Sequence, residues 1–426
     1  MIRHYLSFLL RAALLSFSGS WRFYAWMSLL TLVAGIGGNA YCRQYVAGLG
    51  VTGMTDQVSW GLYIANFTFL VGLAAAAIML VIPAYIYRNK AMHDVVLLGE
   101  LLAIAALVMV ILFITADLGR PDRFWHMIPG IGEFNFPGSI LTWDVLVLNG
   151  YLLVNLHICG YLLYMKYLKK KPKALFYMPF VLLSIGWAIS IHTVTAFLYV
   201  SLVGRPFWNS AIIAPRFLGS AITAGPALLI LVLQFIRIKY TYKIDDKAIY
   251  ILRQIATVSL SINLFLLMCE TFKEFFSPSA HSSSAQYLFF GLEQHGEHFA
   301  SLVPWIWGAL LLEAIAMVIL LVPHTARRIA FLNVACVFAI IGIWIEKGMG
   351  LVIPGFIPSP QGRIVEYFPS ATEVLVCVGV WSFGLLVFSW MLHLAMPILT
   401  GEFAIAETEP EFEGQTDIEL VVDPVS

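Results

Sequence analysis

Charged residues are scarce in this sequence, and the motifs of many soluble enzymes are absent. Lys, Arg, Asp and Glu make up 12% of the 426 residues, whereas soluble domains average about 25%. Positive and negative charges cancel, so the charge balance does not favour nucleic acid as a partner. The chain contains no Walker motif, no GxGxxG after a predicted strand, and no HExxH, CxxC or CxxCH sequence. These absences argue against a nucleotide-binding domain, a zinc protease and a c-type cytochrome.

The five cysteines are spread along the chain, and each lies in or beside an apolar segment: Cys42, Cys159, Cys269, Cys336 and Cys377. Iron–sulfur clusters and structural zinc sites need several thiolates grouped together. We therefore expect no iron–sulfur cluster and no metal site in this chain, and we interpret the thiols as small core side chains.

Long apolar runs are what the sequence has in abundance. Hydrophobic residues make up 60% of the chain, and the mean hydropathy is +0.85. A helix that crosses a membrane needs about 20 apolar residues. The sequence therefore predicts an all-α integral membrane protein with ten transmembrane helices at residues 23–46, 58–87, 94–117, 140–166, 175–203, 211–237, 248–275, 299–323, 329–350 and 371–398.

Basic residues predict the orientation of these helices. With residue 1 in the cytoplasm, the inner segments carry about twice as many Lys and Arg as the outer ones, which fits the positive-inside rule. The strongest inner marker is KYLKKKPK at 166–173. Both termini are then cytoplasmic, and residues 1–402 form a multi-pass domain in the cytoplasmic membrane. We expect an interfacial helix before the first span and an acidic cytoplasmic tail at 403–426.

Ionisable side chains inside the spans are functional candidates, because a charge in a bilayer is costly. A step of about 100° per residue places Asp144, Tyr151 and Asn155 on one face of the fourth span. This polar stripe suits either proton transfer or hydrogen bonds between helices. His192 lies past mid-membrane toward the outside, with Tyr199 near the same face. It suits either the carbonyl of a bound quinone or a hydrogen-bonded core position.

Further acids form candidates for a proton path. Glu270 and Glu274 lie one turn apart on the seventh span, so they repel each other unless a cation or a proton intervenes. Glu100, Glu313 and His157 lie deeper in their spans. Most of the intramembrane ionisable groups nevertheless lie toward the outer face. This asymmetry predicts proton-coupled chemistry, or a polar substrate, near the extracytoplasmic surface.

The segment FITADLGRPDRFWHMI at 113–128 ends the third span on that same side. Pro121 prevents simple continuation of the helix, and Gly119 permits a turn. Arg120 can pair with Asp117 or Asp122, and the aromatic residues that follow suit a membrane interface. The long outer connections are either ordinary loops or a surface for an extracytoplasmic partner.

Several segments together resemble the NrfD/PsrC family of quinone-reactive membrane subunits. They are SWGLYIANFTFLVGLAAAA, ADLGRPDRFWHMI, GRPFWNSAIIAPRFLGSAITAGPALL and EKGMGLVIPGFIPSPQGRIVEYFPS. The resemblance covers nearly all of the hydrophobic region. Ten spans fit the larger subgroup, found in the Dsr, Qrc, Hmc and alternative complex III assemblies, and the match to the Dsr type is the strongest.

The resemblance implies two four-helix bundles, from spans 2–5 and 6–9, with the first and last spans peripheral. It implies menaquinone bound near the outer face, no haem or cluster in this chain, and a ferredoxin-like iron–sulfur partner outside the membrane. Other membrane and cytochrome subunits, and a role in sulfur or sulfate metabolism, are implied as well. The chain would be the quinone-reactive part of an oxidoreductase and no enzyme by itself.

Carried over by position, the resemblance implies that Asp144 and His192 are the acid and the histidine beside the quinone. The pocket edge and wall would include Asp117, Arg120, Trp60, Tyr63 and Asn66, and we add Tyr199 because it shares the face of His192.

Two other functions fit parts of the sequence. Ten spans with intramembrane acids suit a proton- or ion-coupled transporter, although paired Gly/Pro breaks are not evident. A cytochrome b-like haem subunit would need two facing histidines at one depth, and only His157 and His393 come close.

Overall fold

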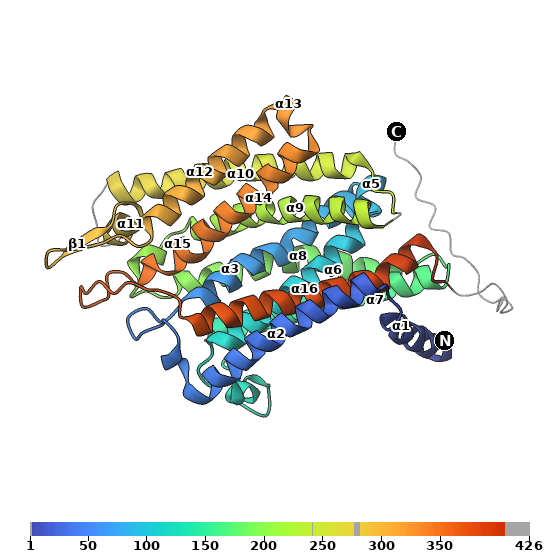
Figure 1. Cartoon of the computed structure of the whole chain (residues 1–426), viewed down its shortest axis with the longest axis horizontal. Helices are drawn as coiled ribbons and strands as arrows, with labels where there is room; N and C mark the ends of the chain where they lie inside the picture. The colour runs from blue at the N-terminus through green and yellow to red at the C-terminus, as the bar shows by residue number, and fades with distance from the viewer. Residues whose placement is uncertain (1, 241, 277–281, 405–426) are drawn as a thin grey trace.

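The computed structural model describes residues 2–240, 242–276 and 282–404, and these residues are almost entirely helical (Figure 1). Within these described residues, ten helices are long and apolar enough to cross a membrane, which confirms the predicted number. They are α2 (Trp21–Ala47), α3 (Leu62–Ala74, continued to Ile86), α6 (Val96–Asp117), α7 (Ile140–Tyr167), α8 (Ala174–Val200), α9 (Ile213–Lys239), α10 (Asp246–Phe276), α12 (Val303–Leu321), α14 (Ile329–Ile343, continued to Phe356) and α16 (Ala371–Thr400).

Short elements connect or extend these helices. They are α1 (Ile2–Ser16), η1 (Leu49–Val51), η2 (Ala75–Ala77), α4 (Ile78–Val81), η3 (Ile82–Ile86), α5 (Lys90–His93), η4 (Pro121–Met127), η5 (Pro206–Trp208), α11 (Ser282–Phe289), α13 (Pro323–Ala326), η6 (Trp344–Met349), α15 (Gly350–Val352) and η7 (Pro354–Phe356). Two short strands, β1 (Leu292–Gln294) and β2 (Glu297–Phe299), form an antiparallel hairpin.

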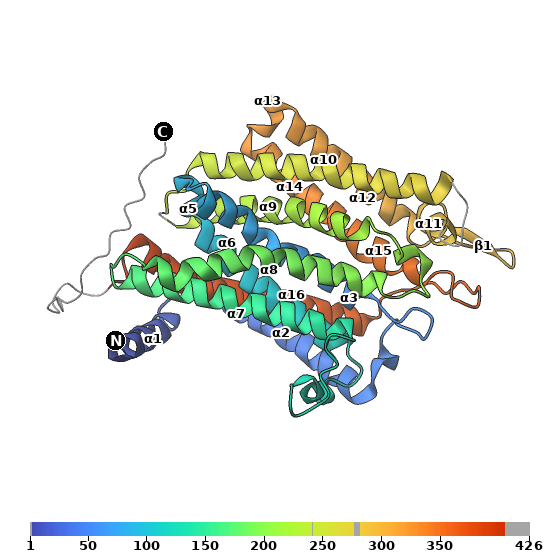
Figure 2. The same cartoon turned by 180° about the vertical axis from the view of Figure 1, so that it is seen from behind.

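The long helices form two four-helix bundles. In the first bundle α3 packs on α6, α6 on α7, and α7 on α8; in the second, α9 packs on α10 and α14, and α12 on α14. Helices α3 and α8 contact α9, so the bundles share one seam. Helices α2 and α16 pair with each other and cover α6 from outside (Figures 1 and 2). This arrangement confirms the architecture expected from the sequence.

The connections divide the molecule into two ends. The β hairpin, α11 and the connection at 118–139 lie at one end, which we call the hairpin end (Figure 1). The lysine-rich connection at 166–173 and α1 lie at the opposite end, which we call the basic end (Figure 2). Which end faces the cytoplasm stays a prediction from the positive-inside rule. The predicted acidic tail lies, from residue 405 on, outside the described residues.

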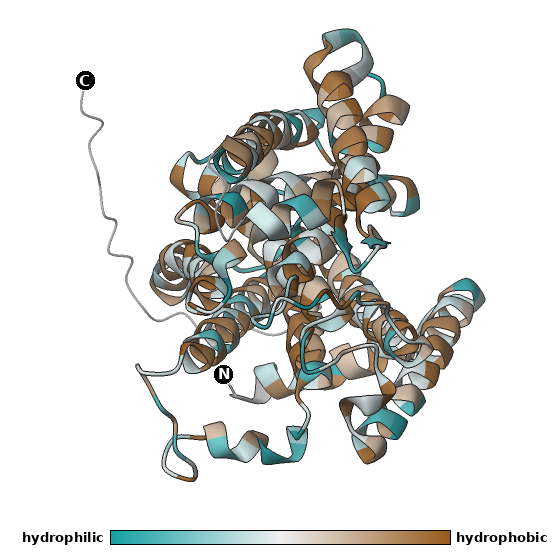
Figure 3. Ribbon diagram, turned by 90° about the vertical axis from the view of Figure 1, so that its left-hand side faces the viewer, coloured by the Kyte–Doolittle hydropathy of each residue, from teal (hydrophilic) through white to brown (hydrophobic). Residues whose placement is uncertain are grey.

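The helices are coloured largely as hydrophobic in Figure 3, and many of their large apolar side chains are exposed. Leu153, Met268 and Leu311 are each more than 60% exposed, although they belong to three different long helices. Large apolar side chains in water would be unfavourable, whereas in a bilayer they contact lipid at no such cost. The surface therefore fits a protein embedded in a membrane.

The first helix, α1, is separate from the spans. Phe8 packs on Tyr164 and Tyr167 near the basic end, and Arg11 donates a hydrogen bond of 3.0 Å to the Tyr167 hydroxyl. Leu10 and Leu14 on the same helix are exposed. The helix has the amphipathic character of an interfacial element, as the sequence predicts.

Two spans are not regular α-helices. The second changes to a 3₁₀ turn and then, at Pro83, to a π-helical turn. The ninth changes to a π-helix, η6, over Trp344–Met349. A π-helical turn inserts an extra residue into the turn, so it alters which side chains face inward. In η6 the consecutive residues Glu346 and Lys347 are both buried.

A glycine contact determines how closely α2 and α16 approach. A Cβ atom added to Gly379 would lie 2.6 Å from the Cα of Gly37, which real contacts do not allow. Small residues permit close packing of helices in membranes, where no hydrophobic effect drives the helices together. We expect Gly379→Leu to separate the two helices and to cost about 1–3 kcal/mol of stability.

The measurement is the midpoint of thermal unfolding in detergent. Gly35→Leu is the matched control, because a Cβ at Gly35 meets no atom within 4 Å. Equal midpoints for Gly379→Leu and the control would contradict the importance of this contact.

Candidate functional site

Asp144 joins α7 to α8 within the first bundle. The carboxyl group is fully buried, and its Oδ1 lies 3.3 Å from the Thr195 hydroxyl. That hydroxyl also lies 2.8 Å from the Ile191 carbonyl oxygen, so its single proton serves one acceptor at a time. The Oδ2 atom of Asp144 is buried and has no hydrogen-bond partner. Buried carboxyl oxygens are normally hydrogen-bonded, so this atom is available to a ligand or a proton.

His192 lies one turn before Thr195 on α8. Its Nδ1 atom is 3.1 Å from the Ala188 carbonyl oxygen. Because a carbonyl can only accept, Nδ1 carries the proton, and the Nε2 atom of the neutral ring has a free lone pair. The Nε2 atom is buried and unpartnered. The neighbouring helices α7 and α8 therefore each present one unbonded acceptor, and both predicted catalytic side chains are buried.

Aromatic side chains surround the hairpin-end side of this region, and we call Trp60, Tyr199, Trp208 and Phe356 the aromatic group. The ring of Tyr199 lies 5.5 Å from Trp60 and 5.2 Å from Trp208, centroid to centroid, and Trp60 stacks on Trp208. The edge of Phe356 contacts both indoles. The Tyr199 hydroxyl is hydrogen-bonded to Thr68 of α3. Such a wall suits a flat apolar ligand.

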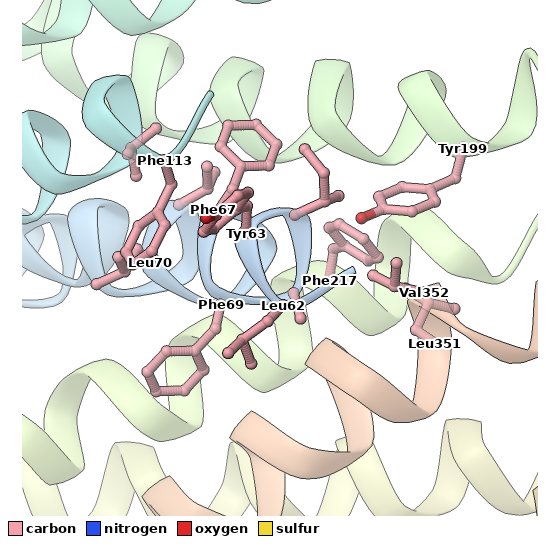
Figure 4. Close-up of a cluster of buried hydrophobic side chains, with 14 of the residues drawn as sticks. Leu62, Tyr63, Phe67, Phe69, Leu70, Phe113, Tyr199, Phe217, Leu351 and Val352 are labelled. Carbon is pink, nitrogen blue, oxygen red and sulfur yellow. The ribbon is translucent and has the colours of Figure 1, made fainter. Parts of the chain in front are cut away.

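Phe217 of α9 connects the aromatic group to the second bundle. Figure 4 shows its ring beside Tyr199 of the first bundle, with Val352 and Leu351 of α15 nearby. The rings of Phe217 and Tyr199 are 5.7 Å apart. Trp208 donates a hydrogen bond of 2.9 Å to the Leu351 carbonyl oxygen across the same seam.

Tyr63 and Asn66 form structural hydrogen bonds on another side of α3. The Tyr63 hydroxyl donates to Gln44 of α2 at 2.6 Å. The Asn66 carbonyl oxygen accepts from the indoles of Trp344 and Trp381, at 3.1 and 2.9 Å. These contacts hold α3 against α2, η6 and α16. The structure thus brings Trp60 and Tyr199 together but directs Tyr63 and Asn66 toward other helices.

The predicted rim residues lie at the hairpin end. Arg120 forms a two-pronged pair with Asp122, with N–O distances of 3.0 and 2.8 Å. The guanidinium holds the pKa of the Asp122 carboxyl below its usual range. Asp117 does not share this pair; its Oδ1 atom is buried and unpartnered. The sequence allowed Arg120 to pair with Asp117 or Asp122, and in the structure it pairs with Asp122.

The second bundle contains a buried group of charged side chains that the sequence analysis did not predict to lie together. Arg216, in the first turn of α9, forms ion pairs with Glu270 of α10 and Glu346 of η6. The three side chains are between 2% and 11% exposed. One guanidinium therefore serves two carboxylates, and we call these residues the Arg216 triad.

Two more acids lie close to the triad. Glu274, one turn after Glu270, lies 3.5 Å from the half-exposed ammonium of Lys273. Glu313 of α12 is fully buried, and neither of its carboxyl oxygens has a hydrogen-bond partner. The Cα side of Gly342 packs on the Glu313 side chain. The predicted repulsion between Glu270 and Glu274 is thus relieved by two separate cations.

Another buried acid, Glu100 of α6, lies in the half of the first bundle nearer the basic end. Cys159 of α7 donates to Glu100 Oε2 at 3.4 Å, while Oε1 is unpartnered. Asn155 and Tyr151 are buried on the same helix, and the Asn155 amide donates to the Tyr151 carbonyl oxygen. The predicted polar stripe therefore faces the bundle interior.

His157 does not belong to that stripe. The structure places it on the exposed surface of α7, where its Nε2 lies 2.9 Å from the Phe176 carbonyl oxygen and its ring contacts Phe180. His157 thus faces the side of α7 opposite to Cys159, away from the interior of the bundle. His393 bonds to carbonyl oxygens of Leu15 and Ser18. The two histidines thus bond to different segments and do not face each other as haem ligands would.

Arg216 and Lys347 are the residues that sequence reasoning missed. Arg216 lies near the start of the predicted span at 211–237, where a cation at the membrane boundary is common. Lys347 follows Glu346 directly, so a regular helix would turn their side chains apart. A cation inside a long apolar run is a signal of function by itself, and it applies to both residues.

Together these features define a multi-pass helical membrane protein whose ionisable groups are buried between its helices. The chain belongs to the NrfD family, described as polysulphide reductase, NrfD, which matches residues 50–357.

Relatives of known description span most of the chain. A protein of Halobacterium salinarum named as a membrane subunit of a dimethyl sulfoxide reductase is 26% identical, over 85% of this chain and 88% of its own. The Hdr-like menaquinol oxidoreductase integral membrane subunit of Archaeoglobus fulgidus is 25% identical, over 86% and 91%. The integral membrane subunit of the menaquinone reductase of Nitratidesulfovibrio vulgaris is 28% identical over a shorter stretch, 31% of each chain.

The Arg216 triad generates a prediction about stability. Arg216→Met leaves two buried carboxylates without a cation, which costs about 3–5 kcal/mol. We expect a lower midpoint of thermal unfolding in detergent, with recovery when Glu270→Gln and Glu346→Gln are added to remove the uncompensated charges. Arg327→Met, at an exposed site near the basic end, is the control. A triple variant as unstable as Arg216→Met would show that packing, and not charge, dominates.

Proposed function

We propose that this chain binds menaquinone or menaquinol beside Asp144 and His192 and exchanges electrons with a partner iron–sulfur protein. The observation that carries the proposal is the pair of buried, unbonded acceptors, Asp144 Oδ2 and His192 Nε2, next to the aromatic group. Membership of the NrfD family supports it, and so do the two relatives named for menaquinol or menaquinone. Both side chains are buried in this conformation, so a quinone enters only when neighbouring side chains move.

The two acceptors suit the removal of protons from a quinol. Oxidation of menaquinol releases two electrons and two protons. His192 Nε2 accepts one hydroxyl proton, and Asp144 Oδ2 accepts the other, directly or through water. The electrons pass to the partner's cluster. In the reverse direction the same atoms deliver protons to the quinone, so the site serves either direction of electron flow.

The hairpin end is the surface that we assign to the partner. Gln294 of β1 donates to the Gly362 carbonyl oxygen at 2.6 Å and accepts from the Ile364 amide at 3.1 Å. The Glu366 carboxylate accepts from the Ser301 amide at 2.9 Å. These bonds tie the hairpin to the connection before α16, giving an ordered surface. We assign this end to the extracytoplasmic side, where a ferredoxin-like subunit docks, while cytochrome and further membrane subunits complete the complex.

A finer assignment concerns the type of complex. The segments HTVTAFLYVSLVGRPFWNSAIIAPRFLGSA and EKGMGLVIPGFIPSP are most similar to DsrP, the membrane subunit of the DsrMKJOP complex of sulfur-metabolising prokaryotes. We propose this role in sulfur or sulfate metabolism. Copurification of iron–sulfur and cytochrome subunits of that complex with this chain tests the assignment.

A proton path from Asp144 toward the basic end is part of the proposal. Tyr151, Asn155 and Glu100 continue inward from Asp144 along the α6–α7 side of the first bundle. In vesicles that contain the complex, we expect Glu100→Gln to keep quinone binding but to reduce the pH change per quinol oxidised. Glu402→Gln, at the exposed end of α16, is the control. An unchanged pH signal in Glu100→Gln would remove Glu100 from the path.

The quinone site itself is tested by His192→Ala and Asp144→Asn in the assembled complex. Each change removes a proton acceptor, so we expect quinol oxidation to fall by about 100-fold or more. Measurement of quinone affinity alongside turnover separates a loss of binding from a loss of proton transfer.

Thr193→Val is the matched control on the same helix. Its hydroxyl bonds only within α8, to the Ile189 carbonyl oxygen at 2.9 Å. If the His192 and Asp144 variants assemble and both behave as the control does, the assignment of the site is wrong.

A further inference from the structure

Lys347 is a buried cation beside the seam of the two bundles. The residue is 4% exposed, and its Nζ atom donates to the Phe217 carbonyl oxygen at 3.1 Å. The ammonium also lies 4.3 Å from the centroid of the Phe217 ring. A backbone carbonyl and an aromatic face stabilise this charge. Among the described residues, no carboxylate lies within 4 Å of it. A buried lysine in such surroundings exchanges its proton readily, whereas an arginine does not.

The Lys347 side chain reaches the first bundle. A Cβ atom on Gly72 of α3 would lie 3.5 Å from Nζ, so the ammonium rests against the backbone of that helix. Thr68, one turn earlier on α3, is bonded to Tyr199. The Phe217 ring beneath the ammonium packs on Tyr199 (Figure 4). His192 lies within electrostatic range of Lys347. Lys347 is therefore a near neighbour of the proposed quinone site, although it belongs to the second bundle.

On its other side Lys347 adjoins the Arg216 triad. Glu346 is the preceding residue, and the π-helical turn keeps both side chains inside. The charged or titratable groups near Lys347 are Glu346 on its own helix, Arg216 on α9 and the neutral His192 on α8. Glu270 on α10 and Glu313 on α12 lie within range of Arg216.

Two small cavities flank the ion pair of Arg216 and Glu346. One, lined by Lys347 and Ser220 as well, has a volume of about 10 Å³. The other has about 20 Å³ and extends along Glu270 to Glu274. A water molecule needs roughly 10–15 Å³ of such space. The larger cavity thus has room for about one water among carboxyl groups, and Glu274 at its far side pairs with the half-exposed Lys273.

We propose that Lys347, Glu346 and Glu274 form a proton route from the His192 site to the hairpin-end surface through the second bundle. The route rests on the proposed quinone function. The Lys347 ammonium first gives a proton to Glu346 through the small cavity that both side chains line, and the neutral amine then takes a proton from the side of His192. Water beside the Arg216 triad carries the proton on to Glu274 and the solvent. Each group returns to its starting state, and Arg216, which keeps its protons, holds the carboxylates in place.

The test uses the assembled complex with menaquinol and compares Lys347→Met, Lys347→Arg and Glu346→Gln with wild type. We expect about tenfold or greater loss of turnover in all three, with unchanged quinone affinity, because the proton route is interrupted while Asp144 and His192 are retained. The solvent deuterium isotope effect should rise, since proton transfer becomes limiting. Lys166→Met, at an exposed position near the basic end, is the control and should match wild type.

Three results bear on the proposal. Turnover and isotope effect within twofold of wild type in Lys347→Met and Glu346→Gln would overturn the route. Normal turnover in Lys347→Arg alone would also overturn it, because a fixed charge would then suffice. If the complex with Lys347→Met does not assemble, turnover and the solvent isotope effect of Glu346→Gln test the route in its place. A wild-type complex that binds no quinone would contradict the proposed function instead.

Discussion

The ion pairs of Arg216 hold together the end of the second bundle on which the other features depend. One guanidinium binds Glu270 of α10 and Glu346 of η6, so three helices meet at a single buried cation. Removing charges from water is costly, and the cost is recovered only where opposite charges are held in close contact. The triad therefore sets the register of η6 against α9. That register in turn directs Lys347 toward α3.

The two bundles divide the chemistry between them. In the first, Asp144 and His192 each offer an unbonded acceptor, and the aromatic group keeps water away from the hairpin-end side. In the second, Arg216 pairs with Glu270 and Glu346. Phe217 and Lys347 bridge the seam. Proton exchange at a dry aromatic site needs a polar neighbour, and the second bundle supplies one.

Much of the fold followed from the pattern of the sequence, and so did part of the site. The ten spans were predicted, and Asp144, Tyr151 and Asn155, which their spacing places on one helix face, are all buried. The exposure of His157 on the helix surface was not predicted, because apolar runs with uniform hydropathy do not reveal which face of a helix meets lipid. Asn66 looked like pocket lining, yet two indoles use its carbonyl oxygen to join three helices.

The sequence by itself determined that the chain is a helical membrane protein, because every backbone polar group in a bilayer must be bonded within helices. It also determined that acids gather toward one face. Only the tertiary structure decided which charges meet. Arg216, Glu270 and Glu346 are far apart in the chain, and Lys347 faces the first bundle through a π-helical turn that hydropathy does not encode. Such contacts depend on helix rotation and depth, which packing between helices sets.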